Sequence, residues 1–139
     1  MDQTTVALAL VLAGLGAYVV ACKGGGESTA STARPHASAL PDRDPQLAKR
    51  LVEEEGALLL DVRTNFEWEA DHLEGATLIP VQELKGRLGE VQKATGGDED
   101  EPIVVYCRSG SRAAKAKQIL LDAGYTKVTN VGGIDDYPR

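Results

Sequence analysis

An apolar run, Pro102-Ile103-Val104-Val105-Tyr106, ends at a cysteine and is followed by a short Gly/Ser loop and a helical pattern. The loop spans residues 107–112 and reads Cys-Arg-Ser-Gly-Ser-Arg. A buried apolar strand that passes through a tight loop into a helix is typical of α/β domains with a parallel sheet. This stretch limits the possible folds of the chain more than any other.

The same loop carries residues suited to covalent chemistry. A thiol is a good nucleophile as its thiolate, which nearby arginines and the positive end of a helix favour. If the chain turns into a helix near Ser111, the loop N–H groups converge on the sulfur and form an anion-binding nest. The alternative is an ordinary buried cysteine at a strand end. We predict that Cys107 is the catalytic nucleophile and that the rest of the loop binds an anionic substrate: Arg108, Ser109, Gly110, Ser111 and Arg112.

Residues 42–139 alternate between strand-like and helical patterns. Helices are predicted over residues 44–55, 64–70, 83–94 and 111–123, and strands over 57–60, 76–80, 103–106 and 127–131. Thr64-Asn65-Phe66-Glu67 fits a capping box that opens a helix. The alternation predicts an α/β domain whose mostly parallel central sheet of four to five strands is flanked by helices. Ligands bind such sheets at the C-terminal ends of strands, where Cys107 and Asp61-Val62-Arg63 are expected.

The first 41 residues have a different character. Residues 6–21 are apolar and uncharged, shorter than the roughly 20 residues that span a membrane and suited to a signal peptide. Val19-Val20-Ala21-Cys22 resembles the bacterial lipoprotein box, which implies cleavage before Cys22 and lipid on that cysteine. We expect a signal peptide at 1–21, lipidated Cys22 with a flexible tether at 22–41, and a folded domain at 42–139.

The lipoprotein interpretation places the domain on a membrane, facing the periplasm or the cell exterior. The alternative is an uncleaved membrane anchor, for which Lys23 would favour a cytoplasmic domain. The net charge of −6 lies entirely in residues 42–139, because the preceding segment holds equal numbers of acidic and basic residues. No Lys/Arg cluster exceeds two adjacent residues. The charge pattern therefore argues against a nucleic-acid partner, which would need a basic face.

Three motifs, in this order, resemble the single-domain rhodaneses, or thiosulfate sulfurtransferases. They are the Asp61-Val62-Arg63 strand end, residues 67–76 with Ile79-Pro80 behind them, and the loop 107–112 with Gly132-Gly133 downstream. The resemblance covers nearly all of residues 42–139 and implies a rhodanese-like fold. It also implies that Cys107 takes the outer sulfur of thiosulfate and holds it as a persulfide. Cyanide, a thiol or a protein thiol would then accept the sulfur, with no metal and no organic cofactor.

Other charged residues of these motifs are expected to support the site rather than to react. Asp61, Arg63 and Glu67 suit an ion-pair network, including a pair between Arg63 and Glu67, and His72 suits a hydrogen-bonded packing role. The chain departs from the family pattern at Asp71, where glycine is usual. It also departs after the glycine pair, where Tyr137 would stand in for the usual aromatic residue.

Two other functions stay open. The cell-cycle members of the dual-specificity protein phosphatases share this fold, but their Cys-to-Arg loop is one residue longer, which fits a tetrahedral phosphate. A membrane-tethered, non-catalytic or regulatory module that recognises sulfur-containing partners is the alternative outside enzymes.

Overall fold

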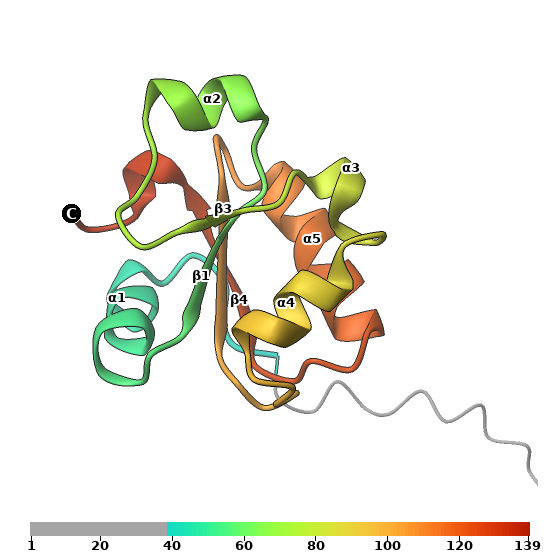
Figure 1. Cartoon of the computed structure of the whole chain (residues 1–139). Helices are drawn as coiled ribbons and strands as arrows, with labels where there is room; N and C mark the ends of the chain where they lie inside the picture. Colours follow the sequence, from blue (N-terminus) through green and yellow to red (C-terminus); the bar gives the residue numbers. More distant parts are fainter. Residues whose placement is uncertain (1–38) are drawn as a thin grey trace, which may run out of the picture. The chain divides into compact units, whose positions relative to one another are not determined.

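The computed structural model describes residues 39–139, and Figure 1 shows how their elements are arranged. A four-stranded sheet lies at the centre in the order β2-β1-β3-β4, and every pairing in it is parallel. Its strands are β1 (Leu58–Asp61), β2 (Thr77–Leu78), β3 (Ile103–Cys107) and β4 (Val128–Gly133). The predicted α/β class and parallel central sheet are confirmed, with four strands.

Helices cover both faces of this sheet, as Figure 1 shows. On one face lies α1 (Pro45–Glu54), and on the other lie α3 (Val81–Leu84), α4 (Leu88–Ala94) and α5 (Ser111–Asp122). The short α2 (Asn65–Ala70) follows the end of β1, and the 3₁₀ turn η1 (Ile134–Asp136) follows β4. Two apolar cores therefore form, one against each face of the sheet.

Alternation along β3 sorts neighbouring side chains between these two cores. Val105 and Cys107 belong to the core beneath α3, α4 and α5, whereas Val104 and Tyr106 belong to the core beneath α1. Successive side chains of a strand point to opposite faces, so this division follows from the strand itself. The Cys107 side chain therefore points toward α5, and its neighbour Tyr106 points away from it.

Two local predictions differ from the structure. The single helix predicted over residues 83–94 was wrong, because the chain forms α3 and α4 with Lys85–Arg87 between them. The sequence there includes Gly86, a weak helix former, and the Arg87 side chain bonds both Glu83 and Glu90 across the break. The last strand also runs through the glycine pair to Gly133 instead of ending before it.

The signal-peptide and lipidation predictions fall on residues that the structure does not describe. Residues 6–21 and Cys22 lie outside residues 39–139. Within the described part of the chain, no helix combines the length and the apolar character needed to cross a membrane.

Candidate active site

Cys107 is the last residue of β3, and its side chain is fully buried. Its Sγ accepts a hydrogen bond from the backbone N–H of Gly110 at 2.9 Å. A backbone amide directed at a sulfur stabilises negative charge on it, as in the anion-binding nests of other proteins. One amide of the loop, that of Gly110, is therefore directed at the sulfur.

The turn from the loop into α5 occurs at Gly110. This residue is the N-cap of the helix and has a left-handed backbone with φ of 94°, a conformation that side chains other than glycine rarely tolerate. The first N–H groups of a helix have no acceptors within the helix, and its N-terminal end carries partial positive charge. The N-terminal end of α5 therefore adds donors and positive potential directly beside Cys107.

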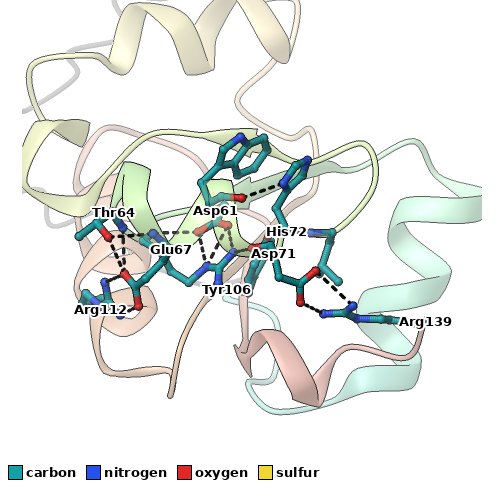
Figure 2. Close-up of polar contacts among 11 residues, drawn as sticks. Asp61, Thr64, Glu67, Asp71, His72, Tyr106, Arg112 and Arg139 are labelled. Carbon is teal, nitrogen blue, oxygen red and sulfur yellow. Dashed lines mark hydrogen bonds and ion pairs between the residues drawn. The ribbon is translucent and has the colours of Figure 1, made fainter.

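On the α2 side, the loop is held by an ion pair between Arg112 and Glu67, shown in Figure 2. The Nη1 and Nη2 groups of Arg112 donate to the two carboxylate oxygens of Glu67 at 2.6 and 2.8 Å. The same carboxylate accepts from the backbone N–H of Thr64, which completes the predicted capping box of α2. Hydrogen bonding by Arg112 lowers the pKa of Glu67 to about 2. The two helix starts are thus linked by a pair that is charged at neutral pH.

The expected pair between Arg63 and Glu67 was wrong, because each has a different partner. Arg63 pairs with Asp61, with Nη2 to Oδ2 at 2.7 Å, and both side chains are buried. The same nitrogen of Arg63 donates to the backbone oxygen of Asp71 at 2.6 Å. The Arg63 guanidinium also lies 5.5 Å from the ring centroid of Tyr106. This pair therefore holds the turn after α2.

Tyr106 extends that network away from the sulfur. Its hydroxyl accepts a hydrogen bond from the backbone N–H of Leu73 at 3.2 Å, and both side chains belong to the core beneath α1. Because the Cys107 side chain faces the opposite core, this network fixes the loop after α2 without reaching the sulfur.

His72 and Asp71 lie in that same loop, as Figure 2 shows. The His72 ring stacks on Trp68 with centroids 3.8 Å apart, and its Nδ1 lies 2.9 Å from the Trp68 backbone oxygen. The Asp71 carboxylate forms an ion pair with Arg139 at 2.5 Å. Asp71, which stands where the family usually has glycine, therefore binds Arg139. Tyr137 is partly buried and packs against the core beneath α1.

Three of the loop residues expected to bind substrate are exposed. Arg108, Ser109 and Ser111 form the outer rim, whereas Gly110 is buried. The guanidinium of Arg43, from the segment before α1, donates to the backbone oxygen of Ser109 at 3.5 Å. The loop thus exposes these polar side chains and directs the backbone N–H of Gly110 at the sulfur.

On the β4 side, the loop rests on Gly133, which belongs to the glycine pair of the family motif, and on Asn130, which sequence reasoning missed. Gly133 is the register partner of Cys107, and a side-chain carbon added to it would lie 2.5 Å from the backbone oxygen of Arg108. Asn130 is buried, and its Nδ2 donates to the backbone oxygen of Gly110 at 3.0 Å. An amide side chain in the predicted strand, two residues before a glycine pair, was the available signal.

Comparison with known proteins identifies the family of this chain. The model of the rhodanese-like domain family matches residues 44–138. The chain belongs to the rhodanese-like family. The expected family and fold are therefore confirmed.

Individual rhodanese-like relatives agree with this result. The chain is 36% identical over 77 residues to the thiosulfate sulfurtransferase PspE of Escherichia coli (strain K12), which covers 55% of this chain and 70% of that protein. It is 32% identical over 90 residues to a tRNA uridine(34) hydroxylase of Escherichia coli, covering 64% of this chain. The match spans only 26% of that hydroxylase, about a quarter of its length.

Solved rhodanese-like structures show the same fold. A rhodanese with anions from E. coli has a TM-score of 0.53 and 34% sequence identity, covering 59% of this chain and 94% of that one. A human single-domain sulfurtransferase has a TM-score of 0.55 and 28% identity, covering 70% of this chain and 90% of that one.

Proposed function

We propose that this protein is a sulfurtransferase that moves the outer sulfur of thiosulfate, or of a persulfide, to a thiol or to cyanide. The observation that carries this proposal is the hydrogen bond from the Gly110 N–H to the Cys107 sulfur, beside the N-terminal end of α5. Its similarity to a thiosulfate sulfurtransferase and to a rhodanese with anions supports a small anionic donor.

The chemistry takes place in two displacements on sulfur. The Cys107 thiolate attacks the outer sulfur of thiosulfate, so that a new S–S bond forms, the S–S bond of thiosulfate breaks, and sulfite leaves with the electron pair. The product is a persulfide anion on Cys107. Cyanide or a thiolate then attacks the terminal sulfur, giving thiocyanate or a new persulfide and restoring the thiolate. Both steps balance without an external oxidant, reductant or further reactant.

The loop stabilises the negative charge that both steps carry on sulfur. The Gly110 N–H already contacts Sγ, and the N-terminal end of α5 beside it would stabilise the charge on the terminal sulfur of the persulfide. Because Cys107 is fully buried, the donor reaches it only if part of the rim yields. The Arg112–Glu67 pair is partly exposed, at 27% and 20% of the side chains. Arg112 would exchange the Glu67 carboxylate for the anionic donor, and the exposed Arg108 would attract that donor.

The first prediction concerns Cys107→Ser in the full-length protein. Serine has nearly the same shape but is a far weaker nucleophile, so thiocyanate formation from thiosulfate and cyanide should fall to background while the fold is retained. Circular dichroism checks the fold, and mass spectrometry of the wild type should find one added sulfur atom on Cys107 after thiosulfate treatment.

Near-normal turnover in the serine variant would contradict this mechanism. A wild-type protein that neither turns over nor gains sulfur would instead favour the membrane-tethered binding module, or a phosphatase with an unusually short loop.

The second part of the proposal is that a lipid on Cys22 holds the domain at a membrane, facing the periplasm or the cell exterior. The lipoprotein-like Val19-Val20-Ala21-Cys22 sequence supports it. We predict that Cys22→Ser moves the protein from the membrane fraction to the soluble fraction and removes its labelling by palmitate. Membrane attachment that survives this substitution would favour the uncleaved anchor instead.

A further inference from the structure

The side of the Cys107 loop that faces β4 contains a buried amide to which the reaction above assigns no role. Asn130 is 5% exposed and lies within β4, two residues before the glycine pair. A buried amide is costly unless it is hydrogen-bonded, so its contacts indicate why the position is polar.

Both ends of the Asn130 amide bond the backbone of the site. Its Nδ2 donates to the backbone oxygen of Gly110 at 3.0 Å, and its Oδ1 accepts from the backbone N–H of Gly132 at 2.9 Å. One side chain thus joins the turn of the loop to the strand on which the loop rests.

The main chain of Asn130 is fixed as well. Its N–H donates to the Asp42 carboxylate at 3.0 Å, and its carbonyl accepts from the N–H of Arg43 at 2.8 Å. The irregular register between β3 and β4 lies directly beside it, because Val105 pairs with Asn130 whereas Tyr106 pairs with Gly132. The amide is therefore presented to the loop from a backbone held on both sides.

The contact with Gly110 acts on the peptide unit that opens α5. The Gly110 carbonyl accepts from both Asn130 and the backbone N–H of Ala114 at 2.9 Å. In a planar trans peptide, fixing this carbonyl also fixes the direction of the next N–H, that of Ser111, on the opposite side. The same residue, Gly110, supplies the N–H that contacts the Cys107 sulfur.

We infer that Asn130 is a positioning residue of the Cys107 loop. By fixing the Gly110 carbonyl, it holds the backbone of the residue whose N–H contacts the Cys107 sulfur, and it does so with a neutral amide that adds no charge to the anion site. This inference rests on the proposed sulfurtransferase function and adds a residue outside the loop to it.

The test compares Asn130→Asp with Thr129→Val in the full-length protein. Aspartate has the shape of asparagine, but its oxygen would face the Gly110 carbonyl without a proton and would bring negative charge to the loop. Thr129 is the adjacent buried polar residue, and its hydroxyl donates to the backbone oxygen of Pro41 rather than to the loop. Both variants lose a hydrogen bond made by a buried side chain, but only the first loses one to the loop.

We expect Asn130→Asp to lower the single-turnover rate of persulfide formation at saturating thiosulfate at least tenfold, and to raise the KM for thiosulfate. Rates are measured where circular dichroism shows each variant fully folded. Thr129→Val should lower the melting temperature while its rate and KM stay within twofold of wild type. Wild-type kinetics in a folded Asn130→Asp variant would overturn the inference. Equal losses of rate in the two variants would also overturn the inference, because Asn130 would then contribute only to the stability of the fold.

Two further measurements keep the outcome decisive. Asn130→Ser removes the Nδ2 contact without adding charge, and should show a smaller loss of rate in the same direction. If neither variant of Asn130 folds, NMR of the wild type should detect scalar coupling across the bond from Asn130 Nδ2 to the Gly110 carbonyl, with and without persulfide. Absence of that coupling would overturn the inference. Failure of the wild type to form a persulfide would instead contradict the proposed function.

Discussion

The two sides of the Cys107 loop are held by different kinds of contact. On the α2 side, Arg112 and Glu67 form a partly exposed ion pair between two long side chains. On the β4 side, the loop is held by backbone contact at Gly133 and by the buried, uncharged amide of Asn130. The Arg112 side chain can exchange its carboxylate partner for an incoming anion. The contacts on the β4 side, in contrast, are closely packed and involve the backbone of the loop.

This difference indicates how a buried sulfur can be both accessible and well placed. Because Cys107 is fully covered, the substrate must displace a covering group. The ion pair is the contact that an anion can replace, since Arg112 would keep a negatively charged partner. The N–H groups that receive charge must stay fixed during that exchange, since their value for catalysis depends on being oriented beforehand. Fixing the β4 side and leaving the α2 side exchangeable satisfies both needs.

The largest effect is expected from closing the space on the β4 side with Gly133→Ala. The φ of Gly133 is −86°, which alanine adopts readily, so the substitution tests close approach alone. The new carbon would lie 2.5 Å from the Arg108 backbone oxygen, and neither strand nor loop backbone can move aside easily. Overpacking of this kind costs about 1 to 3 kcal/mol of stability. The displaced loop should also lower turnover more than tenfold.

Gly89→Ala is the matched control for this prediction. Gly89 lies within α4, and a side-chain carbon added there would meet nothing within 4 Å. Alanine is the better helix former by about 1 kcal/mol, so this variant should be slightly more stable and fully active. Thermal melts and thiocyanate assays on both proteins check the pair. A Gly133→Ala protein with normal activity would mean that the β4 side is not rigid.

Local features of the site could be predicted from sequence because their causes are local. The strand, loop and helix around Cys107 follow from an apolar run, a glycine turn and helical spacing within about a dozen residues. The capping box joins Thr64 and Glu67, three positions apart, and forms as predicted. In each case the interacting groups are close in the chain, so spacing alone determines the contact.

Contacts between distant segments could not be predicted in this way. Glu67 is four residues from Arg63 and 45 residues from Arg112, yet it pairs with Arg112. The choice depends on where α2 and α5 begin relative to the sheet, which spacing does not specify. Asn130 is 20 residues from Gly110, and an irregular register between β3 and β4 lies beside it. Neither the partner nor the register irregularity leaves a periodic signal in the sequence.

A smaller effect is expected from Glu67→Gln, which removes the negative charge on the α2 side. Its pH dependence distinguishes the two sides of the loop more sharply. Glutamine can still cap α2, so the loss is confined to the ion pair. The pKa of Glu67 is about 2 in the folded protein, below its ordinary value of about 4.3 in an unfolded chain. A lowered folded-state pKa contributes stability above the unfolded value, and that contribution is lost as pH falls toward 2. Wild type should therefore exceed Glu67→Gln in unfolding free energy at pH 6, with the gap closing near pH 2.

Urea unfolding of wild type, Glu67→Gln and Asn130→Ser across this pH range measures the contrast directly. The side-chain contacts of Asn130 are to backbone groups, which do not titrate, so the deficit of Asn130→Ser should stay constant from pH 6 to pH 2.5. A closing gap for Glu67→Gln beside a constant gap for Asn130→Ser would separate the two sides of the loop by their chemistry. If the stability deficits of the two variants instead changed in parallel with pH, the ion pair would contribute no more charge-dependent stability than the amide. The assignment of the α2 side as the exchangeable side would then lose its support.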